Sequence, residues 1–181
     1  MMKRILFITL FFCAISYGQN KFITKTGTLN FEASVPSFEE VAAKNNSVTV
    51  LLNAENGEIA ALALVKAFRF KNALMEEHFN ENYAESDKFP KATFKGKLLD
   101  FSSEKLSGTN NLFISGELEF HGVTQQFAKI PVSFEYTNDK IILSGNFSAR
   151  ASEFDIKIPK IVQSKVKDEV QINFSFELLK K

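Results

Sequence analysis

The sequence has few of the residues that enzyme and metal sites most often use. Among 181 residues there are one Cys, two His and no Trp. The single Cys13 lies within an apolar run near the N-terminus. If that run is removed, the mature chain has no thiol, which excludes disulfides, thiol catalysis and thiolate metal sites. The fold must then be stabilised by its hydrophobic core alone.

Motifs of catalysis and nucleotide binding are also missing. The sequence contains no Gly-x-Ser-x-Gly elbow and no phosphate-binding glycine loop. Neither His78 nor His121 has a second His or a Cys at metal-ligand spacing. The formal net charge is +1 for the whole chain, so no strong field favours nucleic acid. We therefore expect no catalytic site, no cofactor, no metal and no nucleic-acid partner.

The first 18 residues have the layout of a signal peptide. Lys3-Arg4 precedes an apolar run at residues 5–15, and the small residues Ser16 and Gly18 follow. The run is shorter than the roughly 20 residues that span a bilayer as a helix, and two bulky Phe residues before Cys13 disfavour lipid attachment. We expect cleavage after Gly18, no membrane anchor, and one domain at residues 19–181 in a periplasmic or secreted protein.

Apolar and polar residues alternate along much of the chain, which predicts strands with one buried face. The expected strands are residues 22–34, 47–53, 58–66, 92–101, 112–120, 128–136, 140–148 and 166–179. Eight antiparallel strands can form a sandwich or a closed barrel. Because closure removes exposed edges, we expect an all-β fold, an eight-stranded antiparallel lipocalin-like barrel.

One or two short helices interrupt the predicted strands. The first opens at Pro36-Ser37, with Glu40 three residues after Ser37 as in a capping box. The second opens at Asn72 and has an apolar stripe at three- and four-residue spacing. The stripe residues are Leu74, Met75, His78 and Phe79.

A barrel of eight strands can be filled by side chains or can hold one small ligand. Small residues on the presumed inner faces would leave room: Ala61, Ala63, Ala92 and Gly96. Pro131 faces outward and predicts an edge or bulge, because proline donates no ladder hydrogen bond. Phe101, Phe113 and Phe127 also fall on the outward side. Either the Asn72 helix or long loops cover them, or they form a patch for a partner, a membrane or a homodimer.

Four motifs follow one another along the chain. They are His78-Phe79-Asn80-Glu81, Phe89-Pro90-Lys91-Ala92-Thr93-Phe94, Gly116 with His121-Gly122-Val123-Thr124, and Phe154-Asp155-Ile156. Their order resembles the YceI-like family of polyisoprenoid-binding, lipocalin-like proteins, from Phe68 to the C-terminus. The resemblance implies an exported bacterial protein whose antiparallel barrel holds a long isoprenoid chain in an apolar tunnel, without catalysis.

We therefore expect non-catalytic binding of an isoprenoid or other long-chain lipid in the barrel interior. The expected tunnel-lining residues are Phe94, Leu98, Leu112, Ile114, Leu118, Phe120, Ile130, Val132, Phe134 and Phe174. His78 is expected either to pack on its helix with a ring nitrogen bonded to the backbone, or to contact a ligand head group. The alternative function is a surface or stress-related interaction protein whose own side chains fill the barrel. A tunnel of several hundred Å³ would favour ligand binding.

Departures from the family pattern concern the tunnel mouth. Asp155 stands where many members have glycine, and Asp is among the residues that tolerate positive φ. The usual histidine after the first strand is missing from the segment Phe31–Pro36, which leaves the ligand open. We expect His121 to bond the backbone of its own turn, and Asp168 to face inward at the rim and reach water or a Lys.

Overall fold

The structure is a computed structural model that describes residues 20–35, 39–102, 108–137 and 139–181. The predicted signal peptide, with Cys13, lies outside the described residues. No helix among the described residues is long and apolar enough to cross a membrane.

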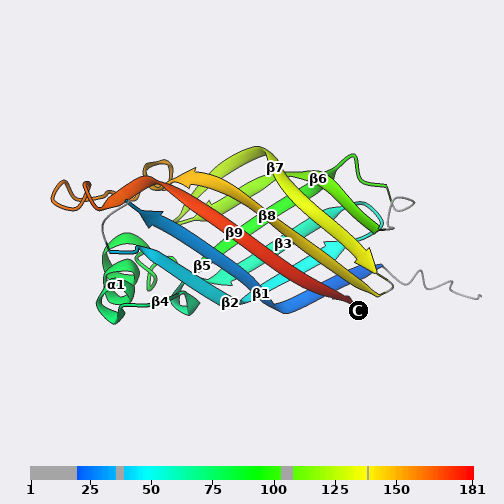
Figure 1. Cartoon of the computed structure of the whole chain (residues 1–181), viewed down its shortest axis with the longest axis horizontal. Coiled ribbons are helices and arrows are strands. Elements are labelled where there is room, and N and C mark those ends of the chain that lie inside the picture. Colours follow the sequence, from blue (N-terminus) through cyan, green and yellow to red (C-terminus); the bar gives the residue numbers. More distant parts are fainter. Residues whose placement is uncertain (1–19, 36–38, 103–107, 138) are drawn as a thin grey trace, which may run out of the picture.

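Eight long strands form a closed antiparallel barrel (Figure 1). The strand order is β1-β9-β8-β7-β6-β5-β3-β2, and β1 pairs with β2 to close the sheet. The eight-stranded barrel predicted from the sequence is therefore confirmed. The strands are β1 Lys21–Ser34, β2 Ala42–Asn53, β3 Glu58–Leu64, β5 Lys91–Leu99, β6 Gly108–Phe120, β7 Val123–Thr137, β8 Lys140–Arg150 and β9 Val166–Lys180.

The long connection between β3 and β5 contains the helix predicted at Asn72. It includes the 3-10 turn η1 (Val65–Ala67), the short strand β4 (Arg69–Phe70), helix α1 (Ala73–His78) and the π turn η2 (Phe79–Tyr83). The Asn72 side chain caps α1 by accepting a hydrogen bond from the Leu74 amide at 2.9 Å. Leu74 itself is 56% exposed, so the buried stripe is narrower than predicted.

The first predicted helix is wrong in its described part. Glu39 to Val41 are not helical, and β2 begins at Ala42. The Val41 carbonyl accepts from the Ala33 amide at 2.9 Å, and the Val41 amide donates to the Ser34 hydroxyl at 3.0 Å. These bonds to the end of β1 continue the hairpin and replace the helix. Pro36 and Ser37 lie outside the described residues.

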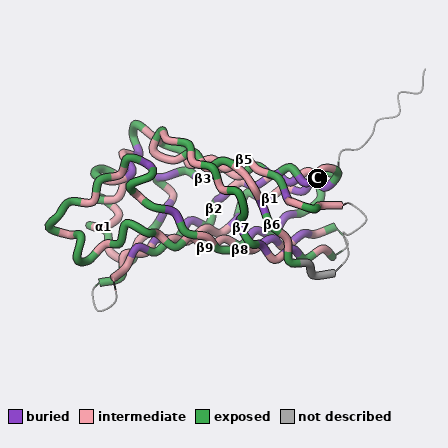
Figure 2. The backbone as a smooth tube through the Cα atoms, turned by 90° about the horizontal axis from the view of Figure 1, so that it is seen from above, coloured by how far each residue is buried: buried purple, intermediate pink, exposed green. Residues whose placement is uncertain are grey.

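The barrel half that contains the C-terminus has a solid core. Figure 2 shows buried positions alternating with exposed ones along the strands, and in this half the inward side chains are large. Those at most 2% exposed include Phe22, Leu52, Leu98, Phe134, Ile141, Leu143 and Leu178. Phe101 was expected to face outward, but Asp100 has a φ of 54° and turns the chain back. The Phe101 ring lies 6.2 Å from that of Phe134 and closes this end.

A bulge in β7 reverses the predicted orientation of Phe127. The pairing of β6 with β7 shifts between Ile114 and Gly116, which changes which residues of β7 face inward. The Phe127 ring consequently faces inward and lies 5.1 Å from that of Phe147. Ala128, which was expected inside, is exposed. Alternation alone misplaced these residues because a bulge has no apolar or polar signature.

Phe113 and Pro131 face outward as predicted. Phe113 is 36% exposed, and the ammonium group of Lys129 lies 3.9 Å from its ring centroid. The ammonium group of Lys129, and not helix α1, therefore covers part of this ring. The ladder between β7 and β8 begins at Val132, directly after Pro131, as expected next to a residue that has no N–H to donate.

The Phe94 ring lies over two facing glycines. Gly96 of β5 pairs with Gly116 of β6. A Cβ atom at Gly116 would lie 2.4 Å from the Lys95 carbonyl oxygen and 2.6 Å from the Phe94 ring. The absence of both side chains lets the strands and the ring approach this closely.

His121 connects three segments at the opposite end of the barrel. Its Nδ1 lies 2.9 Å from the Phe154 carbonyl oxygen, and its Nε2 lies 2.8 Å from a carboxylate oxygen of Glu85. Its ring also packs on Phe89 at 4.6 Å. The expected bond to its own turn is thus replaced by bonds to distant segments. Both partners are acceptors, so both nitrogens donate only when the ring carries two protons.

The turn that holds Phe154 is the 3-10 segment η4 (Ala151–Phe154), and Asp155 ends it with a φ of 57° and a ψ of 22°. The prediction that Asp155 keeps a left-handed backbone is therefore confirmed. Asp168 accepts hydrogen bonds from the Ser152 amide at 2.8 Å and from its hydroxyl at 2.7 Å. Its partner is η4, not a Lys, because the end of β8 brings Ser152 beside the start of β9.

We predict that Gly116→Ala lowers the free energy of unfolding by about 1–3 kcal/mol, since the added methyl group overpacks the contact with Phe94 and β5. The measurement is urea unfolding. Ser115→Thr is the control, because it adds a methyl group to the outer face of the same strand, where a β-branched residue is well tolerated. Equal stability of the Ala variant and the unmodified protein would contradict the prediction.

We predict that His121→Ala destabilises the fold by about 1–3 kcal/mol, because the carbonyl of Phe154 and the carboxylate of Glu85 lose their donor. Urea unfolding measures this loss as well. His78→Ala is the matched control, since no hydrogen bond joins the ring of this exposed residue to the rest of the described chain. Similar losses in the two variants would show that His121 does not hold the segments together.

Candidate functional site

The barrel half next to α1 encloses a cavity of about 460 Å³. Small side chains of β3 and β5, namely Ala61, Ala63 and Ala92, form part of its wall. Because these positions have only a methyl group, the lumen stays open where a larger side chain would fill it. Several large lining residues also belong to the hydrophobic core cluster: Val48, Ile59, Ile114, Ile130 and Phe176.

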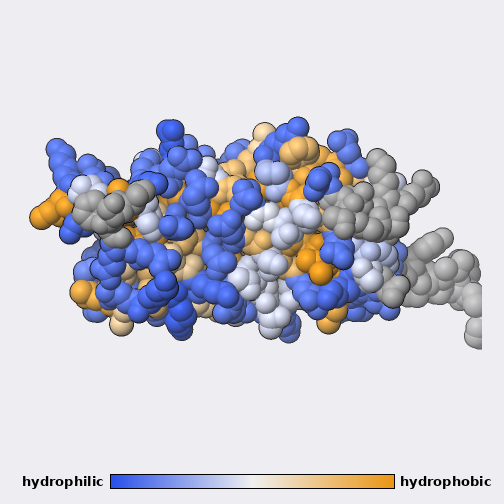
Figure 3. Space-filling model, in the orientation of Figure 1, coloured by the Kyte–Doolittle hydropathy of each residue, from blue (hydrophilic) through white to orange (hydrophobic). Residues whose placement is uncertain are grey.

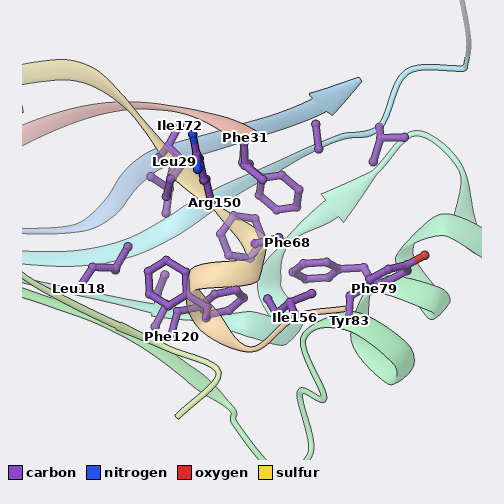
Figure 4. Close-up of a pocket in the computed structure, with 18 of the residues that line it drawn as sticks. Leu29, Phe31, Phe68, Phe79, Tyr83, Leu118, Phe120, Arg150, Ile156 and Ile172 are labelled. Carbon is purple, nitrogen blue, oxygen red and sulfur yellow. The ribbon is translucent and has the colours of Figure 1, made fainter. Parts of the chain in front are cut away.

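Four phenylalanines form an aromatic wall at the α1 end of the cavity. They come from β1, β4, the segment before β4 and the π turn: Phe31, Phe70, Phe68 and Phe79. The ring centroids of Phe31 and Phe79 are 5.3 Å apart, and those of Phe70 and Phe79 are 5.2 Å apart. Figure 4 shows the rings of Phe31, Phe68 and Phe79 grouped at one side of the cavity. These contacts fix the α1 connection against the barrel.

The connection between β8 and β9 forms another part of the wall. Ile156, Ile158 and Val162 line the cavity, and Figure 4 shows Ile156 beside Tyr83 of the π turn. The sequence did not identify these residues as part of the cavity wall, because their segment follows a turn and has no alternation of apolar and polar residues. The sequence did not identify the aromatic wall either, because its four phenylalanines lie in four separate segments of the chain.

Polar side chains are few among the residues that line the cavity. They are Glu39, His78, Tyr83, Thr93, Arg150, Lys165 and Lys167. Most belong to the α1 connection, the segment before β2 or the ends of β8 and β9, which meet at one end of the barrel. The arrangement therefore combines an apolar interior with polar groups at its mouth, as in sites for amphipathic ligands.

Acidic groups near the start of α1 have partners nearby. Asn72 donates to a carboxylate oxygen of Glu39 at 3.0 Å, and Lys71 forms an ion pair with Glu40. The hydrogen bond to Glu40 and the charge of its carboxylate raise the pKa of Lys71. By contrast, Arg150 and Lys165 form no ion pair with any residue that the structure describes. Among the residues that line the cavity, the charge on the β8–β9 side is therefore positive.

Six of the ten residues expected to line a tunnel do line the cavity: Phe94, Ile114, Leu118, Phe120, Ile130 and Phe174. The other four, Leu98, Leu112, Val132 and Phe134, lie in or against the packed core. They face inward as expected, but near the closed end of the barrel, where large side chains leave no space.

His78 lies at the cavity mouth. It contributes to the lining, its residue is exposed, and its ring has no hydrogen bond within the described chain. The expected backbone bond of this ring is therefore not present. No group of three or more His, Cys, Asp or Glu side chains that could hold a metal occurs in residues 20–35, 39–102, 108–137 and 139–181.

Solved structures with the same fold include three bacterial proteins. A polyisoprenoid binding domain from Saccharophagus degradans has a TM-score of 0.76 and 12% identity, covering 90% of this chain and 99% of that one. Burkholderia cenocepacia BcnA has a TM-score of 0.69 and 16% identity, with coverage of 83% and 95%. The Campylobacter jejuni YceI protein has a TM-score of 0.59 and 16% identity, with coverage of 75% and 81%.

Among curated proteins, none matches the chain. The sequence pattern of the YceI-like domain, however, matches residues 17–178. The match extends well before Phe68, so it includes the N-terminal strands in which the sequence departs from the expected opening. The chain therefore belongs to the YceI-like domain family.

Proposed function

We propose that this protein binds an isoprenoid or other long-chain lipid without catalysis, in the periplasm or outside the cell after removal of residues 1–18. The observation that carries the proposal is the cavity of about 460 Å³, with its apolar walls and a mouth that holds the polar groups. This volume lies within the range of about 300–1,000 Å³ found for small-molecule sites.

The cavity walls favour a chain that enters tail first. Apolar side chains surround the lumen, whereas His78 and Lys165 lie at the open end. Burial of an aliphatic chain contributes about 0.8 kcal/mol per CH₂ group. A ten-carbon segment could thus gain roughly 8 kcal/mol before ordering costs are subtracted. The head group would remain near the mouth, where His78 is a candidate contact.

The relatives support this choice of ligand. The Saccharophagus degradans structure is described as a polyisoprenoid binding domain, and its fold covers 90% of this chain. The departure at the N-terminal opening leaves open which lipid fits best. Isoprenoid and other long apolar chains share the property that the cavity would recognise, an extended apolar tail.

The alternative was an interaction protein whose barrel is filled by its own side chains. Large residues do fill the closed half, as Phe22, Leu98 and Phe134 illustrate. The other half keeps its cavity because Ala61, Ala63 and Ala92 stand on its wall. A continuous apolar space of this size favours ligand binding over the self-filled interior.

We predict that the purified, export-processed protein contains lipid in a ratio near one to one, detected by solvent extraction and mass spectrometry. Ala61→Phe places a ring in the cavity and should reduce the extracted lipid at least tenfold. Ala60→Phe is the matched control, because Ala60 is exposed on the outer face of β3, and it should retain the lipid.

Thermal unfolding of both variants establishes that they are folded before the lipid is measured. Repeated absence of lipid from the unmodified protein, also after incubation with a membrane extract, would contradict the proposed function. Equal lipid content in the Ala61→Phe and Ala60→Phe variants would show that the ligand lies outside this cavity.

A further inference from the structure

The β8–β9 connection extends beyond the barrel at the end where α1 lies (Figure 1). Near the middle of this connection, Ile161 is 85% exposed, more than the other exposed large hydrophobic residues Leu64, Leu74, Phe113 and Leu179. Figure 3 shows apolar atoms at the tip of this end, next to hydrophilic atoms. A large aliphatic side chain thus lies in solvent beside the mouth of the cavity.

Hydrogen bonds within the connection hold Ile161 at this position. The Val162 amide donates to the Pro159 carbonyl at 2.9 Å, and the Lys165 amide donates to the Val162 carbonyl at 2.8 Å. Ile158 and Val162, on either side of the tip, line the cavity. The segment therefore directs some of its apolar side chains inward and Ile161 outward.

The charged side chains nearest to Ile161 in the chain are all positive. Around Ile161, residues 156–167 contain four lysines and no Asp or Glu: Lys157, Lys160, Lys165 and Lys167. The acidic residues Glu153, Asp155, Asp168 and Glu169 lie before and after this stretch, next to the ends of β8 and β9. None of the four lysines forms an ion pair with another described residue, whereas Lys66, Lys71 and Lys140 elsewhere do. Four exposed lysines that lie close in the chain to an exposed aliphatic side chain match the chemistry of an anionic bilayer surface.

We propose that the β8–β9 connection docks the open end of the barrel on an anionic lipid bilayer. Ile161 enters the boundary between head groups and acyl chains, and the lysines contact lipid phosphates while their aliphatic stems lie along the apolar layer. Glu77 and Glu81 are exposed at the same end, so the barrel contacts the bilayer with its β8–β9 side rather than with α1. Docking brings the cavity mouth to the surface from which a lipid could enter.

The inference rests on the proposed function only for the reason why the protein would dock, namely to take up a lipid. Docking itself can be measured separately from lipid binding in the cavity. The assay is co-sedimentation of the full chain with vesicles of phosphatidylcholine containing 30 mol% phosphatidylglycerol, compared with vesicles of phosphatidylcholine alone. The unmodified protein should bind the anionic vesicles at least tenfold more tightly, and this preference should fall as salt screens the lysines.

Two variants separate the apolar and the electrostatic contributions. Ile161→Asp should weaken binding to the anionic vesicles at least tenfold. The triple variant Lys157→Gln, Lys160→Gln and Lys165→Gln should weaken it by at least as much, because each lysine near such a surface contributes about fivefold in affinity.

Matched controls lie away from the mouth. Leu179→Asp changes a residue that is 55% exposed at the far end of β9. The triple variant Lys25→Gln, Lys95→Gln and Lys97→Gln removes the same charge from exposed positions of β1 and β5. Both controls should bind the vesicles like the unmodified protein, within about the twofold that a uniform charge change produces through long-range attraction.

The proposal is overturned if the unmodified protein does not bind anionic vesicles at low salt, which would direct attention to a protein partner for Ile161. It is also overturned if the variants at the connection and their controls lose binding equally. The Ala61→Phe protein distinguishes this failure from that of the cavity: it should contain at least tenfold less lipid and still sediment with the vesicles.

Discussion

The volume of the inward side chains decides what this barrel can hold. Eight strands set a bore that side chains can just fill, and the two halves use that bore differently. Leu52, Leu98 and Phe134 fill one half, whereas Ala61 and Ala63 leave the other open. The filled half contributes strongly to the stability of the fold, since burial of large apolar side chains is the dominant favourable contribution to folding. The open half is thereby free to bind a ligand.

The mouth of the cavity is built from segments that the barrel does not hold by strand pairing alone. Phe79 anchors the α1 connection through its contacts with Phe31 and Phe70. His121 connects η4 with the segment at Glu85. Because these contacts position the α1 connection and η4, the entrance depends on a few aromatic and charged side chains rather than on a continuous hydrogen-bond ladder.

Most of the fold could be predicted from the sequence, since alternation reports directly on which face of a strand is buried. The capping role of Asn72 and the left-handed backbone of Asp155 could also be predicted, because local backbone chemistry determines both. The predictions that were wrong involve longer-range effects. A bulge in β7 turned Phe127 inward, and pairing of Val41 with the end of β1 replaced a predicted helix.

The cavity could be predicted only in part. Inward parity identified Ile114 and Phe120 as lining residues, but parity does not tell how far along the bore a residue lies. Leu98 and Val132 were therefore grouped with the lining although they do not line the cavity. Ile156 and Val162 had no periodic pattern that could identify them, because irregular segments place side chains by tertiary contacts.

The most direct test of a divided interior is methyl NMR of the protein titrated with farnesol, a short isoprenoid alcohol. The methyl groups of Ile59, Ile114 and Ile130 line the cavity, whereas those of Ile141 and Leu178 lie in the filled half. We predict large shift changes and contacts between ligand and protein for the first group only. Changes of equal size in both groups, or none in either, would contradict the account.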